Sequence, residues 1–373
     1  MISGLADRVS NELRVLLTPG RRMADELECV ASVLLAIVLA HLIGAKMIAW
    51  AAFSAFVLLK GAMSETLLRG VLRMIGTLLG ATLAIWFVRL SPGVQSPAGL
   101  AVTMLITALV GGVGLYGTLT AHRSYAWLLF GLTFVMILLD KLQQPGIDVQ
   151  SLAVTRVLEV GAGTVACVTV SLVSTLTARR WWPVPPSAAT QHIGWHPDAA
   201  RHAAQAGVAV GLLPLLNHIV AIPELAQAGV TVMAVMIVPV AGLGSSGLAP
   251  VSRRLSHRAL GCLAGGVLAS LVLLIAGGNV PVLVAGTCLG IIAGRHIENG
   301  GPARAYLGLQ FTLAVLIVLI PDDYANVAIE PGLKRFLSVF IGMAVLVPIL
   351  LAGHFLVPER KATDAATDSG TSE

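Results

Sequence analysis

Long runs of apolar residues without a single Lys, Arg, Asp or Glu recur from one end of the chain to the other. They include residues 29–45, 225–252 and 336–358, while residues 259–294 are long enough for two helices that part at Gly277, Gly278 and Asn279. A membrane-spanning helix needs about 20 mostly apolar residues, and flanking Lys or Arg side chains can extend shorter runs. None of these runs alternates as the strands of a membrane β-barrel do. The pattern predicts an all-α polytopic membrane protein with about 12 transmembrane helices.

Composition agrees with this pattern and excludes a soluble enzyme. Hydrophobic residues make up 56% of the chain and charged residues 12%, whereas a soluble domain has about 25% charged residues. The four cysteines form no CxxC pair, so neither a disulfide framework nor a zinc site is indicated. The net charge of +5 is explained by loops that face anionic lipid, so no nucleic-acid partner is expected.

The distribution of Lys and Arg predicts an orientation. If the N-terminus is cytoplasmic and the helices alternate in direction, most Lys and Arg lie in cytoplasmic loops, as the positive-inside rule requires. An odd number of helices would spoil this bias. We therefore expect both termini in the cytoplasm and an even number of spans.

Three landmarks recur at a nearly constant offset and predict an internal duplication. The pattern Arg-x2-Gly-x3-Gly occurs twice, an aromatic segment with a Tyr follows each copy, and a basic residue precedes a glycine at equal spacing near the end of each half. In order, these landmarks are Arg73, Gly76 and Gly80 with Arg258, Gly261 and Gly265; Tyr125 with Tyr306; and Arg156 before Gly163 with Arg335 before Gly342. With an even number of helices in each half, the halves lie parallel, as two six-helix repeats.

This organisation predicts five segments. They are a cytoplasmic amphipathic segment at 1–28, a first six-helix membrane repeat at 29–178, a cytoplasmic linker at 179–200, a second six-helix membrane repeat at 201–358, and a disordered cytoplasmic tail at 359–373.

Polar residues inside apolar helices are the candidates for a substrate path, because charge is costly in a bilayer. These candidates are Arg156, Glu159, Lys334, Arg335, Tyr125, Tyr306 and Gln310. Arg156 and Glu159 are three residues apart and can pair on one helix face, whereas Lys334 and Arg335 have no matching Glu. The alternative is that the cations reach the membrane interface and the aromatic residues belong to an interfacial belt. The repeated Arg and Gly positions are expected to serve packing and topology, with a direct role in gating left open.

Two motifs suggest ligands but are better explained without them. Residues 242–247 match a dinucleotide fingerprint, yet they end a membrane helix and lack the strand and the acidic residue that such a site needs. His192 and His196 have a metal-site spacing in the linker, with Asp198 as the one nearby carboxylate. We expect no metal, no cofactor and no enzymatic activity.

The segment from Trp50 through Lys60, the residues 64–70 and the motif from Arg73 to Ala81 together resemble the fusaric acid resistance family, which includes bacterial aromatic acid exporters. The likeness covers nearly the whole membrane part. Many members carry a large cytoplasmic domain, and this chain resembles the compact, transporter-only form. The resemblance implies a multi-pass protein of the bacterial inner membrane that exports aromatic carboxylic acids or related toxic compounds. It also implies a periplasmic membrane-fusion adaptor as a partner.

The functional hypothesis is therefore a secondary, proton-driven efflux transporter with an anionic aromatic substrate. The alternative is a non-transporting membrane scaffold or an assembly partner of an envelope complex. Homo-oligomerisation is left open by the sequence.

Overall fold

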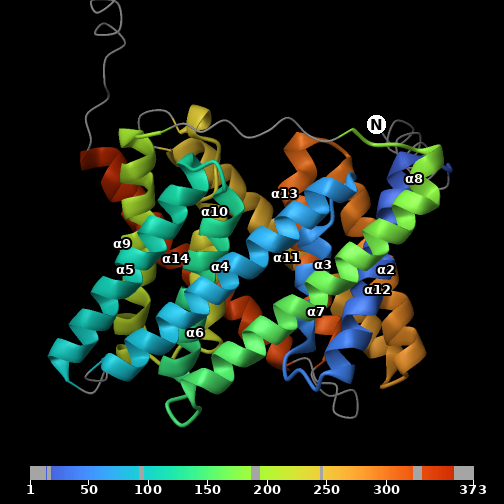
Figure 1. Ribbon diagram of the computed structural model, residues 1–373. Coiled ribbons are helices and arrows are strands. Elements are labelled where there is room, and N and C mark those ends of the chain that lie inside the picture. The colour runs from blue at the N-terminus through green and yellow to red at the C-terminus, as the bar shows by residue number, and fades with distance from the viewer. Residues whose placement is uncertain are drawn as a thin grey trace, which may run out of the picture.

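Helices account for all the regular structure in the part of the chain that is described, which is residue 14 and residues 18–91, 96–185, 194–243, 247–321 and 330–356 of a computed structural model (Figure 1). Residues 1–13 and 357–373 lie outside these ranges, as do His192 and residues 244–246 of the dinucleotide-like motif. The helices are α2 (Arg21–Leu42), α3 (Ile48–Leu58), α4 (Met63–Leu90), α5 (Pro97–Thr120), α6 (Ser124–Gln143), α7 (Val149–Leu176), α8 (Ala178–Trp181), α9 (Pro197–Ile219), α10 (Leu225–Val235), η1 (Val240–Gly242), α11 (Leu248–Ala276), α12 (Val280–Asn299), α13 (Pro302–Leu319) and α14 (Glu330–Leu356).

Eight of the described helices, namely α4 to α7 and α11 to α14, are long and apolar enough to cross a membrane by length and composition. The chain is therefore a helical multi-pass membrane protein. The predicted division of the run 259–294 is confirmed, because α11 ends at Ala276 and α12 begins at Val280.

The eight spans are fewer than the twelve expected, and the four other described helices with more than ten residues show why. The first turns of α2 are rich in charged residues, and α9 carries Asp198, Arg201 and Gln205 near its start. The helices α3 and α10 are apolar but have 11 residues each, and at about 1.5 Å per residue such a helix covers roughly half of a hydrocarbon core.

The short helices α3 and α10 end inside the protein and are followed by irregular chain. After Leu58 the backbone is irregular to residue 62, with a bend at 61–62, and after Val235 it is irregular to residue 239. Thr66 stabilises the first break: its Oγ1 accepts a hydrogen bond from the Lys60 N–H (3.0 Å) and donates to the Lys60 carbonyl (3.1 Å). Broken helices of this kind are a feature of secondary transporters.

The repeated glycines lie where two helices cross with their backbones in contact. A Cβ on Gly76 or Gly80 of α4 would collide with the carbonyl oxygens of Ala126 or Phe130 on α6. On Gly261 of α11 it would lie 2.7 Å from the Leu307 carbonyl oxygen of α13, and on Gly265 it would collide with another α13 carbonyl. The packing role predicted for these glycines agrees with the contacts they make.

One helix of each half packs on the other half. Figure 1 shows α5 beside α9 at one side of the protein and α12 beside α2 at the other. The α5–α9 contact is a backbone contact, because a Cβ on Gly207 would lie 2.5 Å from the Ala108 carbonyl oxygen. The two halves are therefore joined by α5 with α9 and by α12 with α2, and α6 also packs on α10.

The glycine crossings predict a clear stability difference. In Gly80→Ala and Gly265→Ala the new methyl group forces two backbones apart, and we expect a loss of about 1–3 kcal/mol of stability, measured as a lower midpoint of thermal unfolding in detergent. Gly161→Ala on α7 is the matched control, since the nearest atom to its new Cβ would be 3.8 Å away. A control that loses as much stability as the two test variants would contradict this account.

Candidate functional site

The arginine of the first repeated motif lies buried between three helices. Arg73 is on α4, one turn before Gly76, and it is 8% exposed. Its Nη1 donates a hydrogen bond to the Tyr125 hydroxyl on α6 (2.7 Å), and its Nη2 donates to the Ser54 hydroxyl on α3 (2.9 Å). The glycine contact between α4 and α6 sets the distance at which Tyr125 can reach Arg73.

A second arginine lies one turn away on the same face of α4. The Arg69 guanidinium lies over the Tyr125 ring, 4.3 Å from its centroid, which is a cation–π geometry. Tyr125 therefore contacts one arginine with its ring and the other with its hydroxyl.

The second half contains a site of the same design. Arg258 on α11 is 4% exposed, and it donates to the Gln310 side-chain oxygen (2.8 Å) and to the Thr231 hydroxyl (2.9 Å). Arg254, one turn earlier, lies over the Tyr306 ring at 3.9 Å and donates to the Ala234 carbonyl in the last turn of α10 (3.2 Å). The two sites use corresponding helices, α3, α4 and α6 in one half and α10, α11 and α13 in the other.

These four arginines share an unusual electrostatic situation. In the described part of the chain none of them pairs with a carboxylate, and the Nε of each is buried without a hydrogen-bond partner, as is the Tyr306 hydroxyl. The C-terminal ends of α3 and α10 offset part of the positive charge through their helix dipoles. A full counter-charge is missing, although burying an unpaired ion is costly.

What this arrangement can do chemically is bind an anion. Guanidinium groups donate two parallel hydrogen bonds to a carboxylate, in a geometry that a lysine cannot copy. A tyrosine ring beside each arginine pair offers a surface for an aromatic group. We call the sites around Arg69 and Arg73, and around Arg254 and Arg258, the first and second arginine sites.

Comparison with known proteins assigns the chain to a family. A family profile described as "Fusaric acid resistance protein-like" matches residues 35–170 and 208–349, which together are most of the chain. The chain belongs to the fusaric acid resistance protein-like family. No curated protein and no solved structure matches the chain. The two matched segments contain the first and second arginine sites respectively.

The residues that the sequence predicted to line a substrate path form two separate groups in the structure. Tyr125, Tyr306 and Gln310 contact the arginine sites. Arg156, Glu159, Lys334 and Arg335 lie toward the other end of the helices, at the starts of α7 and α14 (Figure 1). The assignment of both groups to one path stays a prediction.

Arg156 is fully occupied by neighbouring acids. Its guanidinium pairs with Asp140 on α6 (2.9 Å) and with Glu159 on its own helix (3.1 Å), so the pair expected from the i,i+3 spacing forms. Glu159 also accepts a hydrogen bond from the Met47 N–H (3.0 Å), and the Trp50 ring lies 4.7 Å from the guanidinium. Unlike the arginine sites, this cluster supplies its own negative charge.

In the second half the matching carboxylate comes from a different helix. Arg335 lies 3.7 Å from Glu224, which precedes α10, and Lys334 pairs with Glu330 at the surface (2.7 Å). Sequence reasoning found no acid for Arg335, because Glu224 is distant in the chain and meets it only through folding. Its position as the left-handed residue before α10 (φ 48°) was also not visible in the sequence.

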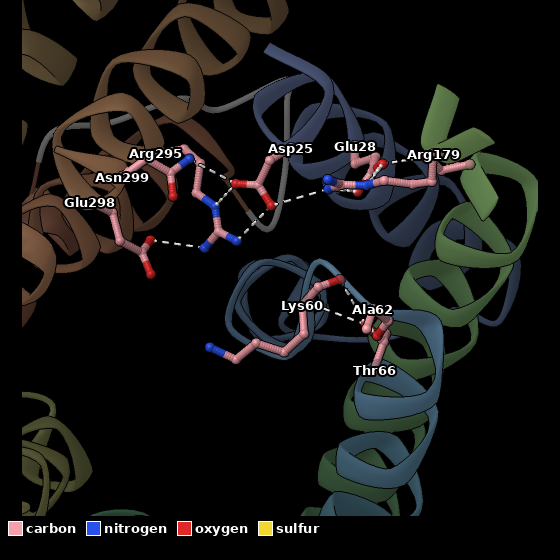
Figure 2. Close-up of polar contacts among 10 residues, drawn as sticks. Asp25, Glu28, Lys60, Ala62, Thr66, Arg179, Arg295, Glu298 and Asn299 are labelled. Carbon is pink, nitrogen blue, oxygen red and sulfur yellow. Dashed lines mark hydrogen bonds and ion pairs between the residues drawn. The ribbon is translucent and has the colours of Figure 1, made fainter. Parts of the chain in front are cut away.

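A third charged cluster, which the sequence did not reveal, joins the two halves through α2 and α12 (Figure 2). Asp25 accepts hydrogen bonds from Arg295 (2.6 Å) and Asn299 (2.8 Å) of α12, and Arg295 also pairs with Glu298 (3.0 Å). Arg179 of α8 pairs with Glu28 (2.7 Å). These acids lie in the segment predicted to be a cytoplasmic amphipathic lead-in, yet α2 begins at Arg21 and buries them. The approach of α12 explains the place of Asp25, and that of α7 and α8 explains the place of Glu28.

Lys60 lies in the break between α3 and α4, beside this cluster. Figure 2 shows its side chain extending away from Thr66 on the side of α12. Burial lowers the pKa of Lys60, and the Arg69 guanidinium lowers it further. Lys60 precedes α4, the helix that carries Arg69 and Arg73.

The contrast between the balanced and unbalanced clusters gives a stability prediction. In Arg156→Ala two carboxylates, those of Asp140 and Glu159, lose their counter-charge inside the protein, and we expect a loss of about 3–5 kcal/mol. The readout is the thermal unfolding midpoint of the purified protein. Lys334→Ala is the control, because its pair with Glu330 is mostly exposed; we expect no measurable change. Equal stability of both variants would contradict the structural role of Arg156.

Proposed function

We propose that this protein is a secondary transporter that exports organic anions, and aromatic carboxylic acids in particular, across the bacterial inner membrane. The observation that carries the proposal is the presence of two arginine pairs, each with one buried member, Arg73 or Arg258, that have no carboxylate partner among the described residues. A carboxylate substrate supplies the negative charge that these arginines lack among the described residues. The tyrosine beside each pair provides the surface for an aromatic ring.

The proposal includes an internal duplication of six helices, each half with its termini in the cytoplasm. The helices α3 and α10 have equal length. The Ser54 and Thr231 hydroxyls each accept a hydrogen bond from the motif arginine, and each packs against the glycine that occupies the matching place on α7 or α14, Gly163 or Gly342. These matched contacts support two parallel halves that share one transport path.

Energy from the proton gradient and a periplasmic membrane-fusion adaptor complete the proposal. Both come from the resemblance to aromatic acid exporters. The Arg-rich ends of α4, α8 and α11 lie on one side, which supports their placement at the cytoplasm.

The test is efflux of a panel of aromatic acids from cells that lack the gene and carry either the wild-type or a variant chain. Arg73→Gln and Arg258→Gln remove a guanidinium but keep a hydrogen-bonding side chain, and we expect the efflux rate to fall at least about ten-fold, a difference of about 1.4 kcal/mol. Arg89→Gln is the control, because Arg89 lies in the last turn of α4 and bonds to the exposed side chain of Gln150. Protein amounts in the membrane are measured in parallel.

If cells with and without the wild-type chain accumulate every acid to the same level, the protein does not transport these acids. That result would favour the scaffold alternative. Normal efflux by both arginine variants would overturn the site.

Proton coupling has its own test. Collapsing the proton gradient with a protonophore should abolish efflux at unchanged ATP levels, since the driving ion is then lost. Efflux that continues under these conditions would contradict proton-driven transport.

A further inference from the structure

The four-residue helix α8, which follows the membrane span α7, points one arginine inward and the next outward. Arg179 is 8% exposed, and its Nε and Nη2 donate hydrogen bonds to the two carboxylate oxygens of Glu28 on α2 (2.7 Å each). This bidentate pair fixes α8 against α2. Because successive helical residues point about 100° apart, Arg180 and Trp181 face outward, and Trp181 is 81% exposed.

The position of α8 is that of a membrane interface. The span α7 ends at Leu176, and α8 begins two residues later at Ala178. Figure 1 shows α8 at this end of α7, beside α2. Tryptophan is enriched where the hydrocarbon of a bilayer meets water, because its ring is apolar and its N–H is polar. The exposed ring of Trp181 is therefore placed at the level of the lipid headgroups.

Two hollows meet at α8. One has a volume of about 590 Å³ and is lined by Arg180 and Trp181 together with the end of α7. The other, of about 230 Å³, lies between α2 and α7 and is lined mainly by apolar side chains, including that of Trp182. Thr177 and Ala178 border both hollows. A cationic surface thus continues into an apolar groove.

The positive charge at this corner is not neutralised within the part of the chain that the structure describes. Glu28 borders the groove, but both its oxygens already accept hydrogen bonds from Arg179. Arg180 has no carboxylate partner among the described residues, and neither has Arg21, which begins α2 next to Gly20 at the edge of the groove. A cation in the first turn of a helix opposes the helix dipole, so local helix energetics do not explain Arg21.

We propose that this corner binds an anionic phospholipid, with the headgroup phosphate at Arg180 and Arg21 and an acyl chain in the groove between α2 and α7. Guanidinium groups bind phosphate through parallel hydrogen bonds, and basic pockets at the ends of membrane helices suit anionic headgroups. The groove reaches Val170, six residues before the end of α7, which is about 9 Å along the span. Its apolar lining fits a ligand that carries a hydrocarbon chain as well as a phosphate.

The proposed lipid site adjoins the contact between the two halves. Besides its pair with Glu28, Arg179 lies 3.5 Å from Asp25, and Asp25 pairs with Arg295 of α12. Figure 2 shows Arg179, Asp25 and Arg295 in one row across α8, α2 and α12. A lipid held by α8 is therefore one residue away from the charged cluster that joins the halves.

The experiment is native mass spectrometry of the purified full-length protein, titrated with dioleoylphosphatidylglycerol or with dioleoylphosphatidylcholine. The two lipids share their acyl chains and phosphate, but only the first has a net negative charge. For wild type we expect the first phosphatidylglycerol to bind about ten-fold more tightly than the first phosphatidylcholine. Arg180→Gln should remove most of this preference, whereas Arg180→Lys, which keeps the positive charge, should retain most of it.

Arg123→Gln is the matched control for charge. Arg123 is exposed just before α6, at the same end of the helices as the end of α7, and it lines neither hollow. The groove has its own pair of variants. Val173→Trp fills it and should weaken phosphatidylglycerol binding several-fold, whereas Leu172→Trp, at an exposed position of α7 outside the groove, should not.

Equal affinity of the wild-type protein for the two lipids would overturn the proposal. An Arg180→Gln variant that binds phosphatidylglycerol like wild type would do the same, as would an Arg123→Gln variant that weakens binding equally. If Arg180→Gln weakens binding and Val173→Trp does not, the acyl-chain groove is wrong. Thermal unfolding of each variant shows that it is folded. None of these results depends on the transport of organic acids.

Discussion

A guanidinium group inside a low-dielectric protein must have its hydrogen bonds and its counter-charge supplied by the surrounding helices. Arg73 and Arg258 each donate two hydrogen bonds to neighbouring helices, but their Nε groups and their charge have no partner among the described residues. Short helices end beside them, so that helix dipoles and backbone carbonyls face the positive charge. Glycines on α4 and α11 let α6 and α13 approach closely enough for Tyr125 and Gln310 to reach the arginines.

Buried cations are balanced by carboxylates at one end of the helices and are not balanced in this way at the arginine sites. Around Arg156 the cation is matched by Asp140 and Glu159, and the result is a closed structural cluster. Around the arginine sites, positive charge is left for a ligand to balance. The cluster of Asp25 and Arg295 lies beside Lys60, in the break between α3 and α4 (Figure 2).

The sequence predicted the membrane class, the break at 277–279 and the Arg156–Glu159 pair, because hydropathy and i,i+3 spacing are local properties. It did not predict that α3 is short, since residues 47–59 are as apolar as a full span. It also placed Arg73 among packing residues and Tyr125 among substrate residues, although the two are hydrogen-bonded. The contacts of Arg335 with Glu224 and of Asp25 with Arg295 depend on which helices become neighbours in the fold. The local sequence around these residues does not show which helices pack together.

The packing of α5 on α9 has a consequence for biogenesis. α5 ends at Thr120 and its partner α9 begins at Pro197, so at a synthesis rate of about 5–20 residues per second α5 waits for several seconds in the bilayer before that partner is made. During this interval the part of its surface around Gly112, which later contacts Gly207, has no partner helix. Assembly of the first half is thus completed by the second half, and the nascent chain passes through a stage at which a membrane chaperone or insertase has an exposed helix face to hold.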